Sequence, residues 1–449
     1  MNKKFLISIL ILWAAKSIAQ DSLSNQPWDD PALAEREDRN IEKYRKGDAV
    51  IKITGKSGKP ISEAKVIVQQ QTHEFLFGCN LFVLGQLKTP ELNTKYGDAF
   101  AHLFNFATIP FYWKGFEPEK GKPRFSENSS FIWRRPPSDP LVKWCKEHDI
   151  TVKGHALMYN RNSVMPDWTA KNNPDLFLKQ AKKHMEEIAK RYKDDIAVWD
   201  VVNEERYRTL YPETGHEVPD DYLPWCFREA AKLFPKDVKL IYNDDLENHE
   251  DPEKYAGFIN DVKGKGIRID GMGIQFHIFD LNIRNNFLDG NLYPPDLLIN
   301  FYDRMAKFGL PIYITEITIA GYGENGYTTQ AKIVKNLYRL WFSIPNMAGI
   351  TWWNLGDGTA YGKENEKENK ALGGLLDKNM DPKPAYDVLD ELINHEWKTN
   401  ETITTGSDGK ARFHGFYGKY KATVIFDGKT YIKEINLSNS GNNNFNIEL

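Results

Sequence analysis

Residues 196–204 read IAVWDVVNE, a short apolar run that ends in an amide and a carboxylate. Seven other short runs of similar character occur along the middle of the chain. They are EFLFGCNLF (74–82), FNFATIPFY (104–112), TVKGHALMY (151–159), VKLIYNDD (238–245), GMGIQFHIF (271–279), PIYITEITI (311–319) and AGITWWNLG (348–356). Runs of this length and apolarity are typical of strands that are buried on both faces of a parallel sheet.

Long amphipathic stretches separate the runs. LFLKQAKKHMEEIAKRYK (176–193) and AKIVKNLYRLWFSI (331–344) both repeat apolar residues at helical spacing. Eight strands that alternate with helices over residues 73–397 predict an α/β fold, specifically a (β/α)8 TIM barrel. A doubly wound open sheet is the alternative, but no glycine-rich phosphate loop follows the first predicted strand.

The two ends of the chain have a different pattern. Residues 47–72 and 398–449 alternate apolar and polar side chains around Gly and Asp turns, which predicts short strands. Because neither end has enough strands to bury a face, we expect one accessory small β-sandwich formed from the N- and C-terminal segments together. Its pattern resembles transthyretin-like or carboxypeptidase-regulatory-like modules. Two unrelated β extensions packed on the barrel are the alternative.

The first 19 residues have the features of a signal peptide. Lys3 and Lys4 precede an 11-residue apolar run at residues 5–15, and Ser17-Ile18-Ala19 has the small-x-small pattern of a cleavage site. We therefore expect cleavage after Ala19 and a secreted or periplasmic protein. The run is too short to span a bilayer, and no membrane span is expected elsewhere. Residues 20–46 are polar and are expected to form a surface lead-in.

Composition excludes several classes of partner and site. The formal net charge of −3 gives no attraction to nucleic acid, and 41% hydrophobic with 27% charged residues is ordinary globular usage. Cys79, Cys145 and Cys226 are odd in number and widely spaced. They are therefore expected to be buried free thiols, not a disulfide framework or a zinc site. We expect a monomer.

Polar residues stand at or near the ends of six of the predicted strands, where the active face of such a barrel lies. They are His155, Asn203-Glu204, Asn243-Asp244, Gln275 with His277, Glu316, and Trp352-Trp353-Asn354. Glu204 and Glu316 come from strands that face each other across the barrel. Two facing carboxylates suit glycoside hydrolysis, in which one is the acid/base and the other the nucleophile. One functional glutamate and one structural ion pair are the alternative.

Five motifs resemble those of glycoside hydrolase family 10, the endo-β-1,4-xylanase family. In chain order they are GHALMYN (154–160), WDVVNE (199–204), YNDD (242–245), YITEITI (313–319) and GGLLDKNMDPKPAYDVL (373–389). The resemblance covers residues 75–395, nearly the whole predicted barrel, and the motifs occur in the family's order.

The resemblance implies a retaining double-displacement mechanism with Glu316 as the nucleophile and Glu204 as the acid/base. It implies that Asn203 bonds the sugar 2-hydroxyl and that His277 bonds Glu316. No metal or cofactor is expected, and the implied partner is a polysaccharide or oligosaccharide. The expected substrate-binding residues are Lys114, His155, Tyr159, Asn203, Gln275, His277 and Trp353.

The chain departs from the family's pattern mainly where the sugar is recognised. The departures are Phe111, Tyr159, Asn160, Thr318, Asn354 and Tyr361. Phe111 replaces a sugar-binding Asn, and Thr318 stands where an Asp supports the histidine. Since Phe111 and Asn354 are expected to reshape the cleft, three hypotheses follow. They are a xylanase, the same mechanism on a different or decorated β-glycan, and a carbohydrate-binding barrel without turnover.

Overall fold

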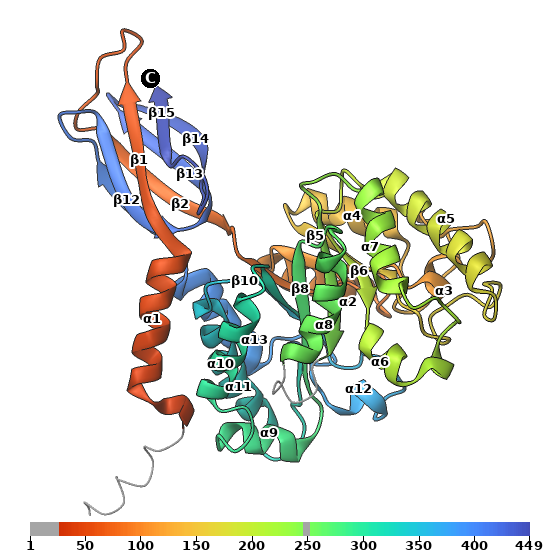
Figure 1. Ribbon diagram of the computed structural model, residues 1–449. Helices are drawn as coiled ribbons and strands as arrows, with labels where there is room; N and C mark the ends of the chain where they lie inside the picture. The colour runs from red at the N-terminus through yellow and green to blue at the C-terminus, as the bar shows by residue number, and fades with distance from the viewer. Residues whose placement is uncertain (1–26, 246–251) are drawn as a thin grey trace, which may run out of the picture.

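The computed structural model describes residues 27–245 and 252–449, and its larger part is a closed barrel of eight parallel strands (Figure 1). Each strand lies in its predicted run to within a residue, which confirms the (β/α)8 fold. The predicted signal peptide, residues 1–19, lies outside the described residues. The barrel strands are β3 (Leu76–Asn80), β4 (Phe106–Pro110), β5 (Thr151–Met158), β6 (Val198–Asn203), β7 (Lys239–Asp245), β8 (Gly271–Ile278), β9 (Ile312–Ile319) and β10 (Met347–Trp352).

Helices surround the barrel and connect its strands. The two predicted amphipathic stretches form α5 and α11, whose apolar faces belong to the main core together with the barrel strands. The helices after β3 are α2 (Pro90–Leu103), α3 (Trp113–Phe116), α4 (Ser138–Glu147), α5 (Pro174–Tyr192), α6 (Glu205–Leu210), η2 (Pro212–Thr214), α7 (Tyr222–Leu233), α8 (Pro252–Gly264), α9 (Leu281–Leu288), α10 (Pro295–Ala306), α11 (Gly326–Ser343), α12 (Lys367–Lys370), α13 (Pro384–Asp390) and η4 (Glu391–Glu396).

Both ends of the chain meet in one β module (Figure 1). One sheet has the order β12-β1-β15 and the other β11-β2-β13-β14, and a separate apolar core lies between them. The fold prediction of a sandwich from both termini is therefore confirmed. Its strands are β1 (Lys46–Thr54), β2 (Lys65–His73), β11 (Asn400–Thr404), β12 (Lys410–Phe416), β13 (Gly418–Phe426), β14 (Lys429–Leu437) and β15 (Asn444–Glu448).

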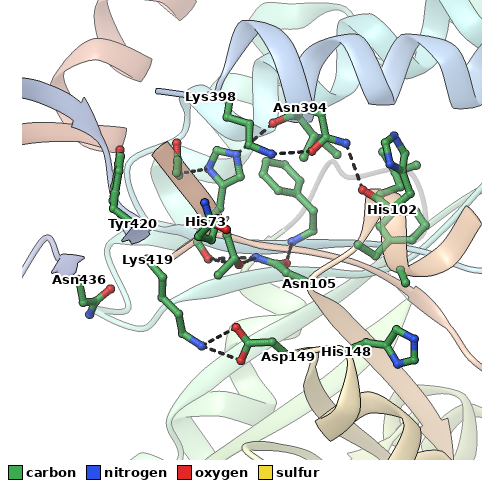
Figure 2. A pocket seen from close by; sticks show the side chains of 18 of the residues that line it. His73, His102, Asn105, His148, Asp149, Asn394, Lys398, Lys419, Tyr420 and Asn436 are labelled. Carbon is green, nitrogen blue, oxygen red and sulfur yellow. Dashed lines mark hydrogen bonds and ion pairs between the residues drawn. The ribbon is translucent and has the colours of Figure 1, made fainter. Parts of the chain in front are cut away.

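The β module stands against the amino ends of the barrel strands. Lys419 of β13 pairs with Asp149, two residues before β5, at 2.7 Å from both carboxylate oxygens (Figure 2). Asn105, just before β4, donates to the carbonyl oxygen of His73 at 3.0 Å. A groove of about 830 Å³ remains between the two parts. The module therefore leaves the opposite, carboxyl-end face of the barrel uncovered.

The polar lead-in contains a helix that the sequence analysis did not predict. Asp30 caps α1 (Pro31–Arg45) by accepting from the Ala32 amide at 2.9 Å, and the helix packs against α11. Glu37 of α1 is buried beside Arg339 of α11, 3.4 Å away. Burial outweighs this partner and raises the pKa of Glu37 to about 7. Helix α1 is thus part of the barrel's outer layer.

The structure also bears on the three cysteines and on the expected lack of a membrane span. Cys79, Cys145 and Cys226 are buried and unpaired, as predicted. Within residues 27–245 and 252–449, no helix combines the length and the apolarity needed to cross a bilayer.

Trp397 is buried in the main core at the point where the chain passes from the barrel to the β module. It is 1% exposed and stacks on Phe342 of α11 at a centroid distance of 4.3 Å. We expect Trp397→Ala to lower the free energy of unfolding by about 3–5 kcal/mol, because it removes a large buried side chain and leaves a cavity. Urea unfolding followed by tryptophan fluorescence and circular dichroism measures this change.

The matched control is Ile432→Ala in β14, where the side chain is 66% exposed. It should change the free energy of unfolding by no more than about 0.5 kcal/mol. Equal effects of the two substitutions would contradict the role assigned to Trp397.

Candidate active site

Glu204 and Glu316 lie at the carboxyl-end face of the barrel, on β6 and β9. Glu204 directly follows β6 and has a φ of 53°, a left-handed conformation that turns the chain from the strand into α6. Glu316 lies inside β9 with its side chain toward the barrel interior. The Glu316 side chain is 6% exposed and that of Glu204 is 20% exposed. The two carboxylates therefore have different access to solvent.

Asn243, at the end of β7, contacts both carboxylate-bearing segments. Its Nδ2 donates to Glu316 Oε1 at 3.0 Å and to Asn203 Oδ1 at 2.8 Å, while its carbonyl oxygen accepts from the Glu204 amide at 2.9 Å. Its Oδ1 accepts from the Thr315 hydroxyl. One fully buried amide thus fixes the position of both glutamates. The sequence predicted that Asn243 stands at a strand end on the active face, but Asn243 was not among the predicted catalytic or substrate-binding residues.

A glycine on the neighbouring strand makes room for this amide. A Cβ at Gly273 would lie 2.9 Å from Asn243 Oδ1 and 2.8 Å from Thr315 Cγ2. Both contacts are closer than real Cβ atoms show, so a larger residue at 273 would displace Asn243. The glycine in the GMGIQ run is therefore part of the site's construction.

The Glu204 carboxylate has three polar neighbours. Gln275 Nε2 donates to Oε1 at 3.3 Å, and Gln275 also lies beside Glu316 in the β8–β9 register. The Tyr159 hydroxyl donates to Oε2, and Arg161 lies 3.5 Å from the same oxygen. Tyr159 and Gln275 were predicted as substrate-binding residues, whereas Arg161 was missed. Arg161 lies in the loop after β5, where hydrophobic periodicity does not predict which way a side chain points.

The Glu316 carboxylate has a histidine as its second partner. His277 Nε2 lies 3.4 Å from Oε2, and His277 Nδ1 lies 3.0 Å from the Thr318 hydroxyl. Burial lowers the pKa of His277, but the hydrogen bond and the charge of Glu316 outweigh it, so the pKa is raised. Thr318 therefore contacts the histidine from the place where the family resemblance led us to expect an aspartate.

A buried wall of aromatic and polar groups stands beside the carboxylates. His155 is held between Asp200, at 2.7 Å from Nδ1, and the Tyr112 hydroxyl, at 3.1 Å from Nε2. Lys153 pairs with Asp200 at 2.8 Å. Trp353 packs edge-on against His155 at 5.5 Å between ring centroids. The predicted residues His155 and Trp353 thus share one wall of the site.

The loop after β4 differs from the expectation. Phe111 is fully buried against Trp199, 4.8 Å between centroids, and belongs to the main core. The expectation that Phe111 reshapes the cleft is therefore wrong, because its side chain points away from the cleft. Lys114 pairs with exposed Asp167 at 2.7 Å. Tyr112, not Lys114, is the residue of this loop that contacts His155, so the substrate role of Lys114 stays a prediction.

Two other departures from the family pattern, Asn354 and Asn160, have local hydrogen-bond partners. Asn354 is buried, and its Oδ1 accepts from Arg134 at 2.7 Å. Asn160 exchanges hydrogen bonds with the backbone of His216. Tyr361 is 57% exposed. Asn160 and Asn354 thus have structural partners that fix the loops around the site.

A closed parallel barrel with two carboxylates held at its carboxyl-end face is the arrangement of a glycoside hydrolase. The model of glycosyl hydrolase family 10 matches residues 93–392 of the chain. The chain belongs to this family.

Curated relatives extend this result. Anti-sigma-I factor RsgI6 of Acetivibrio thermocellus is 25% identical over 390 residues, which are 87% of this chain and 46% of that protein. Endo-1,4-beta-xylanase 1 of Arabidopsis thaliana is 24% identical, over 86% of this chain and 37% of its own length. Endo-1,4-beta-xylanase B of Thermotoga neapolitana is 27% identical, over 68% of this chain and 85% of its own length. The chain therefore spans less than half of the first two relatives.

Solved structures agree on the fold. Xylanase 10B from Thermotoga petrophila in complex with xylobiose aligns with a TM-score of 0.55 and 23% identity, over 72% of this chain and 95% of that one. Native xylanase 10B from Thermotoga maritima also aligns with a TM-score of 0.55 and 24% identity. At this level of identity the structures support the barrel fold and nothing finer.

The raised pKa of His277 makes a testable contribution to stability. A group whose pKa is raised in the folded state stabilises it fully below the unfolded pKa of about 6.5, and this is lost as the pH rises through the folded pKa. His277→Gln keeps a donor near Glu316 but removes the charge. We expect it to destabilise the protein by about 1 kcal/mol near pH 6 and by less near pH 9. Urea unfolding across this pH range measures the difference.

His395→Gln is the matched control, because His395 is exposed at the end of η4. Its curve of unfolding free energy against pH should follow that of the wild type. If His277→Gln also runs parallel to the wild type, the charge interaction with Glu316 does not contribute to stability.

Proposed function

We propose that the protein is a retaining glycoside hydrolase that cleaves β-1,4-xylosidic linkages in xylan. Glu316 acts as the nucleophile and Glu204 as the acid/base. The observation that carries this proposal is the pair of carboxylates fixed through one amide, Asn243, at the carboxyl-end face of the barrel. Membership of glycosyl hydrolase family 10 and relatives named as xylanases support the choice of substrate.

The proposed reaction has two displacements. Glu316 attacks the anomeric carbon while Glu204 donates a proton to the leaving oxygen, which forms a covalent glycosyl-enzyme. Glu204 then accepts a proton from water, and the water attacks the anomeric carbon and releases Glu316. The environments suit these roles, since buried Glu316 lies beside His277 and the more exposed Glu204 can exchange its proton with incoming water.

The wall formed by Tyr112, His155 and Trp353 provides the surface for the sugar. Aromatic rings offer flat apolar faces to the C–H groups of a pyranose, and in this proposal the Asn203 amide, beside Glu204, bonds a sugar hydroxyl. The predicted signal peptide adds the proposal that the reaction takes place outside the cytoplasm. N-terminal sequencing of protein recovered from periplasm and medium tests that part.

We expect Glu316→Ala and Glu204→Ala each to lower kcat on xylan by at least about 10³-fold, because each removes a group from the displacement. Reducing-sugar release measures the loss. Proton NMR of the first product should show the β-anomer for the wild type. On an aryl β-xyloside, whose phenolate leaving group departs without a proton, added azide should restore turnover in Glu204→Ala with a β-glycosyl azide as product, since azide attacks the glycosyl-enzyme without needing a base.

Glu213→Ala is the control, because Glu213 is an exposed carboxylate in η2. It should keep wild-type activity within about twofold. If the wild type binds xylan but cuts no β-glycan, the chain is a binding protein. If only a non-xylan is cut, the mechanism stands and the substrate changes.

Tyr159 is expected to position Glu204 by donating its hydroxyl to Oε2. Tyr159→Phe should lower kcat/KM by about 10- to 100-fold, the loss expected for one hydrogen bond to a charged group. Steady-state kinetics on xylo-oligosaccharides measure it. Tyr207→Phe is the control, since Tyr207 contacts Arg161 only through its ring and should change kcat/KM by less than about twofold. Equal values for the two variants would exclude the positioning role.

A further inference from the structure

A pocket lies next to the candidate active site, and Tyr112 contacts both. It has a volume of about 710 Å³. The Tyr112 ring lines this pocket, while its hydroxyl contacts His155 on the other side. The rest of the lining comes from loops that follow the carboxyl ends of β4, β5 and β10, including α12. The pocket is therefore on the active face, within reach of a chain that occupies the site.

The lining is strongly cationic. It holds five basic side chains and one carboxylate, that of Glu366. The chain as a whole has a formal net charge of −3, so this excess is local and opposite to the overall charge. The basic residues are Lys114, Arg134, Arg135, Lys363 and Lys367.

Most of these cations lack an internal counter-ion. Lys114 pairs with Asp167, but among the residues that the structure describes no carboxylate lies within 4.0 Å of the other four. Arg134 is bonded to Asn354 Oδ1 and to the Thr359 carbonyl, which fixes it in place. Glu368 acts on both arginines from a longer distance and does not line the pocket.

Arg135 is the most constrained of the four cations that have no carboxylate partner in the part of the chain that the structure describes. Its guanidinium lies 3.9 Å from the centroid of the Tyr112 ring, and its NH1 donates to the Arg134 carbonyl at 2.7 Å. Burial lowers the pKa of Arg135 to about 10. A desolvated cation without a counter-ion is unfavourable, and an anionic ligand would relieve it. A guanidinium also matches the oxygens of a carboxylate or sulfate in geometry.

The pocket also has surfaces suited to a sugar ring. Trp133 is 42% exposed and Tyr361 is 57% exposed, although large aromatic side chains are usually more buried. Lys367 lies 4.4 Å from the Tyr361 centroid, so charge and aromatic surface are adjacent. Exposed aromatic faces beside unpaired cations suit a ligand that combines a sugar ring with a negative charge.

On the basis of the proposed function, we propose that this pocket binds an anionic sugar unit of the glycan while the main chain occupies the carboxylate site. The anionic group is a carboxylate, as in a uronic acid branch, or a sulfate ester. The substrate class is then an acidic β-glycan, and the cationic residues determine specificity without taking part in bond cleavage.

The test compares Lys363→Gln/Lys367→Gln with the charge-matched control Lys370→Gln/Lys378→Gln. All four lysines are exposed in the same stretch of chain, and only the first two line the pocket. The substrates are linear xylan oligosaccharides, the same backbone with glucuronic acid branches, and a sulfated derivative. We measure kcat/KM at about 0.05 M and about 0.5 M NaCl, because salt screens exposed charge interactions.

We expect the pocket variant to lose about tenfold in kcat/KM on at least one anionic substrate at low salt, with less loss at high salt and none on the neutral substrate. Loss on the uronic acid substrate alone identifies a carboxylate, and loss on the sulfated one identifies a sulfate ester. The proposal is overturned if the pocket variant matches the control, or if it loses equally on neutral and anionic substrates.

Binding measurements separate this proposal from the proposed function. Titration calorimetry with Glu316→Ala, with and without the two lysine substitutions, measures affinity for each oligosaccharide when turnover is blocked. If the wild type cuts nothing, tighter binding of the anionic oligosaccharide still supports the pocket. If the wild type cuts xylan but Glu316→Ala binds neutral and anionic chains equally, the function stands and the pocket proposal fails.

Discussion

The site depends on one constraint, the hydrogen bonding of a buried amide at the end of β7. Asn243 uses both its donor and acceptor atoms and its own carbonyl to join its strand, β7, to segments of two other strands, β6 and β9. A buried amide with unmet hydrogen bonds is costly, so the partners hold their positions as firmly as the amide holds them. Gly273 permits this arrangement because no Cβ competes for the space. The relative position of the two carboxylates is therefore a property of the barrel's core and not of its loops.

The contacts that hold the β module and α1 to the barrel lie away from the face that carries the candidate active site. The β module and α1 cover the amino-end side and the outer layer of the barrel, where Lys419–Asp149 and Glu37–Arg339 join elements distant in sequence. The carboxyl-end face carries the candidate site and the cationic pocket. A barrel whose amino ends are covered can vary the loops of the other face without losing its core. The departures Asn160 and Asn354 illustrate this, since each has new polar partners among those loops.

Charge is distributed unevenly over the active face. Glu204, Glu316 and the buried Asp200 bring three acidic side chains to one region, where His155 and Lys153 contact Asp200 and His277 contacts Glu316. On the other side of Tyr112 the balance reverses, since no carboxylate of residues 27–245 and 252–449 whose side chain is described pairs with Arg135, Lys363 or Lys367. A neutral sugar at the carboxylates and an anionic group in the pocket would match this division. The tyrosine ring is the boundary between the two regions.

The sequence determined the eight strands, because strands buried on both sides must be continuous apolar runs. Polar residues that interrupt or end such runs had no packing explanation, so Glu204, Glu316, His155, Gln275 and His277 could be predicted as site residues from the sequence, and the structure brings them to one face. Only the tertiary structure showed the contacts of Asn243 and Arg161 with the glutamates, the contact of Tyr112 with His155, and the place of Arg135 against the Tyr112 ring. These depend on loop conformations and on contacts between residues far apart in the chain. Hydrophobic periodicity specifies which way a strand residue faces, but it does not specify which loop side chain reaches it.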